Sequence, residues 1–531
     1  MKSTENSGVS SGRLRHTVVL AAIAAGLLMI TMVAYLLLRT NNSGEVAQQK
    51  VTYSVVFDES VNDAEKAQFE AEIGRRSIEI AQNYTVSSQI IPAIDVQSNL
   101  VVDAYVPVTT FGAVRQQVTT AELMSSAGQI YVDQSVSTEA QRAVAEVLGT
   151  ELVPLALSEL ADSDIMFVSV DSLNFTHKLL EFDGSYYLDE FNSGALFRTL
   201  TVAGDDTGLF DQIVLTDFAE DGDVYTVNMT GVTALTRVMQ RKLASVQDPL
   251  YFSALIGDFL ADADYTHVSN EVSFLDNCSY SNTSFCSPPE FIETLKASGV
   301  DLVELTGNHN NDRGAAANTA TIELYDSLGW DTVGGGLNAE DAAVAVLKTA
   351  KGSDLAFLAY NYPDSPNGAA IARAETAGAN SFDFTRIGKD IAAAKVTSQY
   401  VIVSVQYFEC YSYPNGYLEF PICDKPIEGQ EEDFKKIIDL GADMVVGSSA
   451  HQPQTYELYN GKPIYYGLGN LYFDQTSWPG TERGIVLTHY FSDGNLLQTK
   501  LSPTVFDRDL QTRLMTDAEA EYLLQRLYDA R

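Results

Sequence analysis

The sequence predicts an α/β protein with more than one domain, preceded by a membrane segment. Strand-like and helix-like segments alternate along most of the chain, which is typical of layered α/β folds. A chain of 531 residues is also longer than one hydrophobic core usually serves. A long uncharged apolar run near the N-terminus adds the membrane segment.

The apolar run covers residues 17–38 and is long enough to cross a bilayer as a helix. Lys2, Arg13 and Arg15 precede it, so the positive-inside rule places residues 1–16 in the cytoplasm. No clean small-x-small cleavage site follows, so we expect an uncleaved single-pass signal anchor, with a cleaved signal as the alternative. Residues 39–50 are polar and suit a short linker. The rest of the chain would then be extracytoplasmic.

Residues 51–222 predict a smaller α/β lobe. Strands are expected at 51–56 and 165–170, and helices at 64–82 and 137–148. Residues 223–506 predict a larger α/β domain. Its expected strands lie at 225–229, 301–305, 355–360, 400–405, 444–446, 463–466 and 485–490, and its helices at 289–297, 318–328 and 430–440. Residues 507–531 predict a helical tail over 517–530.

The net charge of −38 and a sequence pI near 4.3 argue against nucleic acid as a partner, because no basic patch is evident. An acidic surface also repels a polyanion unless divalent cations bridge the two or a basic cleft overcomes the mean field. The simpler interpretation is that acidity keeps an exported domain soluble.

The four cysteines lie in two close pairs, Cys278 with Cys286 and Cys410 with Cys423. Four cysteines permit three pairings, and we predict the two local bridges because the compartment is expected to be oxidising. The alternative is four independent thiols. No Cys-x2-Cys spacing is present, which argues against a structural zinc site.

A polar run follows the strand predicted at residues 301–305, at the edge where open α/β sheets build their sites. Asn308 offers a neutral oxygen and His309 an imidazole nitrogen. These ligand types suit a borderline divalent metal or can polarise a phosphoryl or carbonyl oxygen, and Asp312 could orient the imidazole. The alternative is ordinary turn chemistry, because Asn and Asp tolerate left-handed backbone.

Residues 305–314, Leu-Thr-Gly-Asn-His-Asn-Asn-Asp-Arg-Gly, resemble the Asn-Asn-His-x-x-Asp-x-Gly signature of the poly-gamma-glutamate capsule biosynthesis (CapA-type) family, which is related to the calcineurin-like metallophosphatases. Gly307 replaces the first Asn of that signature. Three further blocks, residues 231–237, 263–271 and 441–474, resemble other family motifs. The resemblance covers roughly residues 225–503. It implies a layered αββα, metallophosphatase-like domain with two sheets between helices.

The lobe carries a looser resemblance. Residues 160–173 and 178–185 look like the solute-binding-protein-like lobe that precedes the capsule domain in some family members. Two interpretations stay open: a retained small-molecule site, or a packing lobe without a ligand.

Three positions depart from the family pattern. Val232, Gln406 and Ser449 stand where the family carries a metal-binding Asp and two His residues. A two-metal site needs enough carboxylates and imidazoles to hold both ions about 3.5–4 Å apart. We therefore expect at most one weakly held divalent ion, Mn or Zn, and modest or no hydrolysis. Its candidate ligands are Glu271, Asn308, His309 and His451, which we expect to converge at one cleft on the carboxyl-end rim of the sheets.

The resemblance also suggests roles for single residues. Candidate catalytic groups are His309, Asp312 and Glu271, and the alternative for Glu271 is a surface carboxylate. Candidate substrate-binding groups are Arg237, Arg313 and Asn470. The two arginines can grip a carboxylate or phosphate, but ordinary salt bridges are equally plausible for them, and Asn470 is expected to fix a tight turn near the site. His267 has no counterpart in the motifs, so we expect it at the surface.

The first functional hypothesis is a membrane-anchored CapA-type protein that synthesises, exports or tethers an anionic surface polymer such as poly-gamma-glutamate. Its expected partners are the membrane, the polymer and capsule-synthesis membrane subunits. The second is an extracellular metal-dependent hydrolase of phosphoesters or gamma-glutamyl amides. The third is a solute-binding or sensing protein that uses the lobe.

Overall fold

The fold is that of a computed structural model, which describes residues 54–92 except 77, 79 and 81, together with 100–125, 128–204, 210, 224–279, 284–362, 370–410 and 422–531. The chain divides into two compact units, one of residues 1–55 with 79–84 and one of residues 56–78 with 85–531. The predicted cytoplasmic tail, membrane anchor and linker, residues 1–50, lie outside the described residues. None of the helices that are described combines the length and apolar character that a bilayer crossing requires.

The N-terminal segment, residues 54–204, is built around one mixed sheet. Its strands follow the order β1-β2-β10-β3-β7-β5-β6, with β8 against β3, and β4 pairs with β9 in a small second sheet. The strands are β1 (Val55–Phe57), β2 (Tyr84–Ile91), β3 (Leu100–Thr110), β4 (Gln117–Val118), β5 (Ile130–Asp133), β6 (Leu152–Leu155), β7 (Ile165–Ser169), β8 (His177–Leu179), β9 (Glu181–Phe182) and β10 (Leu196–Ala203). The helices are α2 (Asp63–Arg76), α3 (Thr120–Ser125) and α4 (Thr138–Leu148).

The helix predicted at residues 137–148 is α4. The Ser137 side chain accepts from the amide of Ala140, and Gly149 ends the helix in the left-handed conformation that glycine adopts most readily. The helix predicted at 64–82 is α2, which is shorter than expected and ends at Arg76. There the amide of Ile78 donates to the carbonyl of Ile73 (3.1 Å) and closes the last turn.

The C-terminal segment, residues 224–531, contains two large sheets. The first has the order β14-β13-β12-β11-β24-β25-β26, with β23 against β11, and the second has the order β16-β17-β19-β20-β22-β21. The strands of the first sheet are β11 (Tyr225–Thr233), β12 (Tyr265–Asn270), β13 (Val300–Glu304), β14 (Asp331–Val333), β23 (Asn470–Tyr472), β24 (Arg483–Ser492), β25 (Asn495–Phe506) and β26 (Thr512–Leu514). Those of the second are β16 (Val346–Ala350), β17 (Ser353–Asn361), β19 (Tyr400–Gln406), β20 (Met444–Ser448), β21 (Tyr456–Tyr459) and β22 (Lys462–Tyr465).

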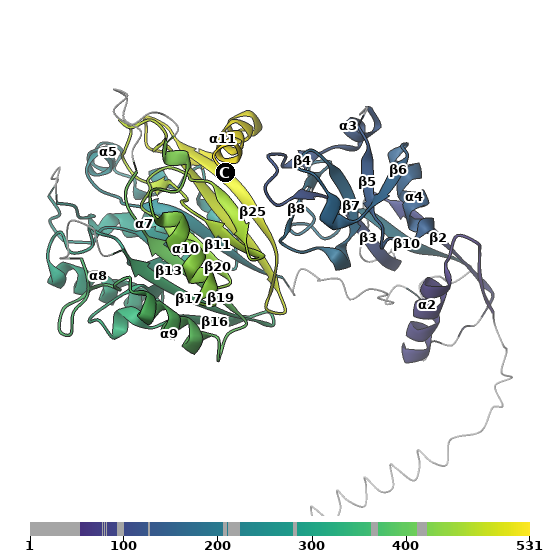
Figure 1. The fold of residues 1–531 in the computed structure, drawn as a ribbon, viewed down its shortest axis with the longest axis horizontal. Helices are drawn as coiled ribbons and strands as arrows, with labels where there is room; N and C mark the ends of the chain where they lie inside the picture. Colours follow the sequence, from purple (N-terminus) through teal and green to yellow (C-terminus); the bar gives the residue numbers. More distant parts are fainter. Residues whose placement is uncertain are drawn as a thin grey trace, which may run out of the picture. The chain divides into compact units, whose positions relative to one another are not determined.

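Six described helices of this segment cover the two sheets on their outer faces (Figure 1). They are α5 (Val238–Val246), α6 (Gly257–Ala261), α7 (Ile292–Ala297), α8 (Ala315–Leu328), α9 (Phe384–Ala394) and α10 (Gln430–Asp439). Helix α11 (Asp517–Asp529) packs against the core between the sheets. The short strands β15 (Gly335–Gly336) and β18 (Gly378–Ala379) form a separate pair. The helix predicted at residues 289–297 begins with a 3-10 turn, Pro289–Phe291, before α7.

Strand β17 shows how the layers are held together. Leu355, Phe357 and Ala359 point into a core shared by both sheets. The alternate residues of the strand, Ala356, Leu358 and Tyr360, pack with α9 and α10 on the other side. Successive side chains of a strand face opposite sides, so a strand buried on both faces must be apolar throughout. The order helix, sheet, sheet, helix follows from these packing contacts.

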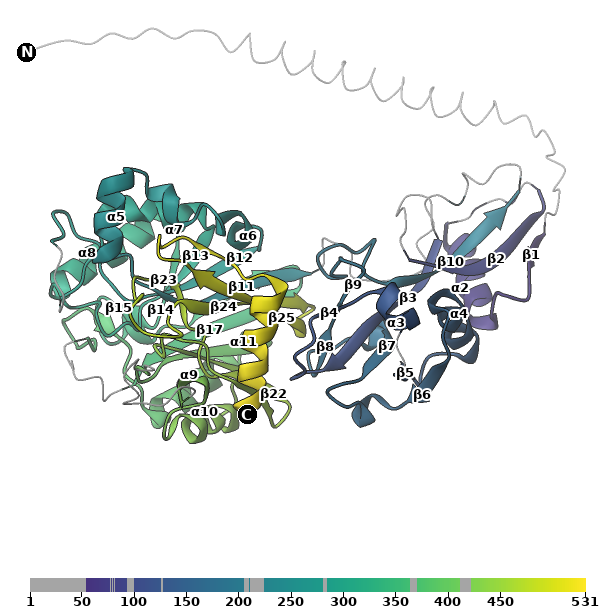
Figure 2. The same cartoon turned by 90° about the horizontal axis from the view of Figure 1, so that it is seen from above.

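Helix α11 closes the shared core from the end of the chain. Leu523, Leu524 and Leu527 enter that core, and α11 lies along β25 in both ribbon views (Figures 1 and 2). Thr516 and Glu519 form a capping box at its start, which satisfies the first free amides of the helix. In residues 507–531 the strand β26 precedes this helix and extends the first sheet.

Candidate functional site

Three side chains from separate loops meet at the amide of Gln406, the last residue of β19. Its Nε2 atom lies 3.4 Å from Oε1 of Glu271, 3.3 Å from Oδ1 of Asn308 and 3.3 Å from Oγ of Ser449. Glu271 follows β12, Asn308 follows β13 and Ser449 follows β20. Parallel strands end at the same edge of their sheet, which brings these loops together. We call these four residues the Gln406 cluster.

Glu271 is the most deeply buried member of the cluster, with 1% of its surface exposed. Burial raises the pKa of its carboxyl well above the usual value, and the nearby Glu409 and Glu304 carboxylates raise it further. Gly307 makes the close packing possible, because a Cβ atom at that position would come within 2.5 Å of the Glu271 Cα. The glycine that replaces the first Asn of the signature thus abuts the backbone of Glu271.

His309 is held in a fixed orientation by Asp312. The imidazole Nδ1 lies 2.8 Å from Oδ2 of Asp312, and the same oxygen accepts from the amide of Phe285 (2.8 Å). The ring also packs on Phe285, with the ring centroids 4.2 Å apart. A carboxylate that accepts from Nδ1 leaves Nε2 as the basic nitrogen of the neutral ring. The arrangement places that nitrogen for acid-base chemistry.

His451 is buried and paired with Asn470. Its Nδ1 lies 2.9 Å from Oδ1 of Asn470, whose amide donates in turn to Gln475 (3.1 Å) and to the carbonyl of Thr481 (2.9 Å). Burial lowers the pKa of His451, the Glu409 carboxylate opposes that effect, and His309 adds to it. Asn470 therefore orients His451, and its own polar atoms bind protein groups.

The backbone around the cluster is strained. Ser449 has φ 75°, His451 has φ 59° and Arg237 has φ 48°, although none of them is a glycine. Such conformations cost of order 1–3 kcal/mol each and concentrate at functional sites. Strain at three positions around one cluster favours a functional interpretation of the site.

Arg237 lies between two aromatic rings. Its guanidinium is 4.5 Å from the centroid of Phe285 and 4.8 Å from that of Phe473, and it forms a two-point ion pair with Asp474. The ion pair with Asp474 is the ordinary salt bridge that the sequence allowed as the alternative to contact with an anionic ligand. Val232, on β11, is fully buried in an apolar group with Phe285 and Phe473.

Arg313 faces the first disulfide loop. Its guanidinium donates to the carbonyls of Ser279 (2.7 Å) and Ser284 (3.0 Å), which both lie within the loop closed by Cys278 and Cys286. The bridge Cys278–Cys286 and the bridge Cys410–Cys423 are both present, so the predicted local pairing is confirmed. Arg313 therefore stabilises this loop through backbone carbonyls.

The prediction that His267 lies at the surface is wrong. It is 2% exposed, and its Nε2 lies 3.1 Å from Oε2 of Glu304, which is 1% exposed. The motif comparison missed it because His267 lies within β12, whose six residues are all buried. The structural roles of Gln406, Glu304 and Asp474 were also not anticipated. Their positions at or next to strand ends were the available signal.

The residues present do not suit a two-metal centre. Among the described residues no group of three or more His, Cys, Asp or Glu side chains is arranged to hold a metal ion. Within the Gln406 cluster, Glu271 Oε2 and Gln406 Oε1 are buried and find no hydrogen-bond partner in the described part of the chain. Two unpartnered acceptors side by side with Asn308 and Ser449 fit at most one cation, bound by oxygen atoms.

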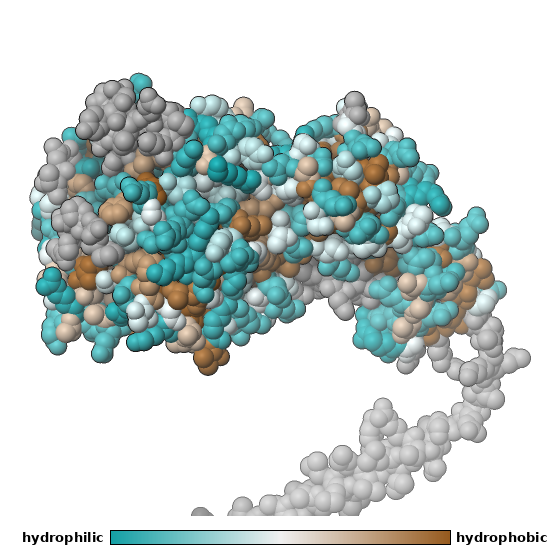
Figure 3. Space-filling view, in the orientation of Figure 1, coloured by the Kyte–Doolittle hydropathy of each residue, from teal (hydrophilic) through white to brown (hydrophobic). Residues whose placement is uncertain are grey.

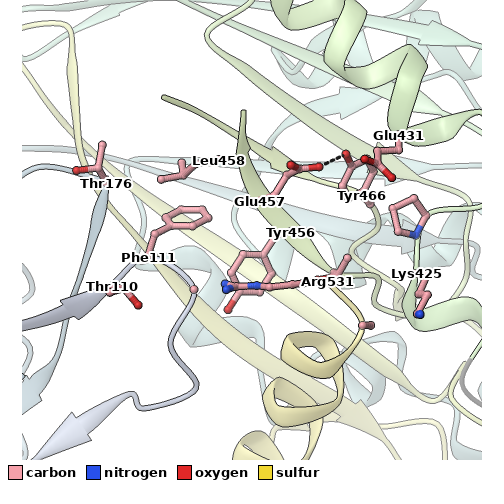
Figure 4. A pocket seen from close by; sticks show the side chains of 14 residues that line it. Thr110, Phe111, Thr176, Lys425, Glu431, Tyr456, Glu457, Leu458, Tyr466 and Arg531 are labelled. Atoms are coloured by element: carbon pink, nitrogen blue, oxygen red, sulfur yellow. Dashed lines mark hydrogen bonds between the residues drawn. The ribbon is translucent and has the colours of Figure 1, made fainter. Parts of the chain in front are cut away.

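Two other regions of the described chain contain pockets. At the edge of the second sheet, Tyr466 donates to Glu457 (2.6 Å), near Glu431 and Lys425 (Figure 4). In the N-terminal segment a cavity of about 510 Å³ lies between α4, β2 and β10, and Arg198 at its wall is already bound by Glu65 (3.2 Å). Neither region brings together residues that the sequence singled out.

Comparison with known proteins identifies the C-terminal segment. Residues 226–475 match the model of the bacterial capsule synthesis protein family. The chain carries a capsule synthesis domain. All four members of the Gln406 cluster lie within the matched residues. The departures at Val232, Gln406 and Ser449 therefore belong to the family domain itself.

Three curated relatives match this chain over about the length of the capsule synthesis domain. The capsule biosynthesis protein CapA of Bacillus anthracis is 27% identical over 248 residues, 45% of this chain and 57% of that protein. The PGA biosynthesis protein CapA of Bacillus subtilis is 24% identical over 215 residues, 40% of this chain and 53% of that protein. A probable polyglutamine synthesis accessory protein of Mycobacterium tuberculosis is 27% identical over 249 residues, 44% and 62% of the two chains. The chain thus spans little more than half the length of these relatives.

Solved structures give fainter likenesses. A hypothetical protein from Thermus thermophilus is 14% identical with a TM-score of 0.32, over 52% of this chain and 98% of that chain. A putative 5'-nucleotidase from Staphylococcus aureus is 11% identical with a TM-score of 0.30, over 58% of each chain.

Proposed function

We propose that this chain acts at the outer face of a cell membrane in the synthesis, export or tethering of an anionic surface polymer such as poly-gamma-glutamate, and that the Gln406 cluster is its working site. The proposal rests on the convergence of Glu271, Asn308 and Ser449 on the Gln406 amide within a capsule synthesis domain. The names of the curated relatives point to the same class of polymer.

The surface chemistry bears on how an anionic polymer would approach. The described face of the C-terminal segment is largely hydrophilic (Figure 3), and the whole chain carries a net charge of −38. Such a surface repels a polyanion in general, so binding requires local neutralisation. Arg237 is bound by Asp474, and Arg313 donates to loop carbonyls, which leaves a bound cation as the more direct source of positive charge.

A gene deletion in the source organism tests the proposal. Surface polymer is stained, hydrolysed and analysed for glutamate in the deletion strain, and then in strains that express wild type, Asn308→Ala or the control Glu428→Gln. Glu428 is exposed and is not a member of the cluster. We expect polymer to be lost on deletion and restored by wild type and Glu428→Gln, but not by Asn308→Ala. Unchanged polymer in the deletion strain would contradict the proposal.

The second candidate function is hydrolysis of phosphoesters or gamma-glutamyl amides, and the His309–Asp312 pair favours it. A basic Nε2 on an imidazole fixed by a carboxylate is the usual arrangement of a general base. A divalent metal, when bound, would supply Lewis-acid activation of the substrate oxygen. Glu271, Asn308 and Gln406 would hold it.

This candidate is tested with the purified full-length protein and both substrate classes, with and without added magnesium, manganese or zinc. Turnover that disappears in His309→Ala supports it. Absence of turnover on either class under all metal conditions would retire it. The solute-binding hypothesis is tested separately, by thermal shift with phosphate, amino acids and short polyglutamates, because a ligand selective for the folded state raises the melting temperature.

The membrane anchor is part of the proposal. An uncleaved helix at residues 17–38 would hold the capsule synthesis domain outside the cell membrane, where the polymer accumulates. The N-terminal sequence of the protein recovered from membranes tests this. A new N-terminus beyond residue 38 would overturn it.

A further inference from the structure

The side chains around Gln406 offer oxygen atoms as possible metal ligands. Glu271 contributes a carboxylate, Asn308 an amide oxygen and Ser449 a hydroxyl, and Gln406 brings its own carboxamide. The two nearby imidazoles each use Nδ1 for another partner, His309 for Asp312 and His451 for Asn470. The three side-chain atoms in contact with Gln406 Nε2 are therefore all oxygen atoms.

The Gln406 amide is poorly matched to its present neighbours. One NH2 group has two hydrogens, yet three acceptors lie 3.3–3.4 Å from Nε2, beyond the usual N–H···O range of about 2.7–3.2 Å. On the other side of the amide, Oε1 is buried and has no donor among the described residues, and Glu271 Oε2 is in the same condition. A buried acceptor without a donor costs roughly 1–3 kcal/mol.

Rotation of the carboxamide by 180° exchanges Oε1 and Nε2. The terminal torsion of Gln is broad and roughly two-fold, so this rotation is cheap. It would place Oε1 beside the Glu271, Asn308 and Ser449 oxygens. A cation bound between these oxygens then satisfies Gln406 Oε1, which has no donor among the described residues.

We propose that Glu271, Asn308, Gln406 and Ser449 bind one hard, oxygen-seeking divalent cation, Mg²⁺ or Ca²⁺, and discriminate against Zn²⁺. Carboxylate, carbonyl and hydroxyl oxygens suit Mg²⁺ and Ca²⁺, whereas imidazole and thiolate ligands suit Zn²⁺. The replacement of family histidines by Gln406 and Ser449 removes two imidazole ligands of the kind that Zn²⁺ prefers. The cation would give the acidic domain a local positive charge at which polymer carboxylates can bind.

The binding of polymer carboxylates at the cation rests on the proposed function, but cation binding itself does not. Binding to the purified protein is measured without polymer, so the two ideas fail separately. A protein that binds Mg²⁺ or Ca²⁺ in a strain whose polymer is unaffected by the deletion would keep the cation site and lose the polymer role. Polymer loss on deletion, with no cation bound, would do the reverse.

The test uses the full-length protein in detergent, stripped with EDTA and titrated calorimetrically with Mg²⁺, Ca²⁺ and Zn²⁺ in turn. We expect one Mg²⁺ or Ca²⁺ per chain, and binding at least tenfold weaker in Glu271→Gln and in Asn308→Ala. Asn308 is only half-buried, so its truncation serves if the buried Glu271 variant does not fold. The control Glu428→Gln should bind like wild type.

A variant that restores a zinc ligand tests the predicted metal selectivity. Gln406→His restores an imidazole at the centre of the cluster, and we expect it to raise the affinity for Zn²⁺ relative to Mg²⁺ at least tenfold. Three results would each overturn the proposal: no Mg²⁺ or Ca²⁺ binding by wild type, tighter binding of Zn²⁺ than of both at this site, or undiminished binding by folded Glu271→Gln.

Discussion

The Nε2 atom of His267 on β12 lies 3.1 Å from Oε2 of Glu304 on the neighbouring strand β13, and both side chains are almost completely buried. The other carboxylate oxygen of Glu304 accepts from Thr306 and from Ser448 (3.3 Å). Ser448 ends β20 in the second sheet. One carboxylate therefore joins the two sheets, and it lies near enough to Glu271 to contribute to the raised pKa of that carboxyl.

Glu304→Ala should destabilise the protein strongly. It leaves His267, Thr306 and Ser448 without their acceptor inside the core, and loss of one partner from a buried pair costs about 3–5 kcal/mol. Urea unfolding of the two variants Glu304→Ala and Glu323→Ala measures this. Glu323 is an exposed residue of α8, and its replacement should change the free energy of unfolding by no more than about 0.5 kcal/mol. Equal stability of the two variants would show that the pair contributes nothing.

Asp312→Asn should reduce function while the fold persists. The amide keeps the size of the side chain but removes the charge that fixes His309 with its proton on Nδ1. If His309 acts as a base, turnover or polymer yield should fall roughly 10²-fold or more. Asp326→Asn, an exposed position on α8, is the matched control. Wild-type function in Asp312→Asn, at an unchanged melting temperature, would remove His309 from the mechanism.

His489 should make stability depend on pH. Burial lowers its pKa to about 3, and His267 adds to the effect, whereas in the unfolded chain the pKa is about 6.5. The unfolded state therefore takes up the proton first, so this contribution to stability is present above about pH 6.5 and is lost as the pH falls towards 3. Between pH 8 and pH 5 the expected loss is about 2 kcal/mol.

The check on His489 is urea unfolding across that pH range for wild type and His489→Gln. The variant cannot titrate at this position, so its stability should fall less with decreasing pH. Its Nδ1 partner is Thr499 (2.9 Å), and an amide can replace that hydrogen bond. Parallel pH profiles for the two proteins would contradict the assignment.

Removal of a disulfide should cost a few kcal/mol. For loops with sequence separations of 8 and 13, the chain-entropy model gives about 2–3 kcal/mol each, with the Cys410–Cys423 bridge worth about 0.4 kcal/mol more. Unfolding of the two double Cys→Ser variants under oxidising conditions measures this. A mass map of the non-reduced digest is the independent check, and crossed pairs or free thiols would refute the pairing.

The sequence by itself determined the local elements that its spacing specifies strongly. Helix α8 ends at Leu328 and α4 at Leu148, as the sequence predicts, and α10 occupies the predicted range with Phe434, Ile437 and Ile438 buried. These features depend on neighbouring residues in the chain, such as a cap or an apolar face, so a sequence carries them directly. The pairing of nearby cysteines belongs to the same class.

Only the tertiary structure decided which polar residues act together. Gln406, noted in the sequence as a lost ligand, proves to contact Glu271, Asn308 and Ser449, and these contacts span 135, 98 and 43 residues of chain. His267 was expected at the surface because it has no counterpart in the motifs, but its strand is buried on both faces between helices and the second sheet. Strand order and register bring such residues together, and both depend on the packing of the whole domain.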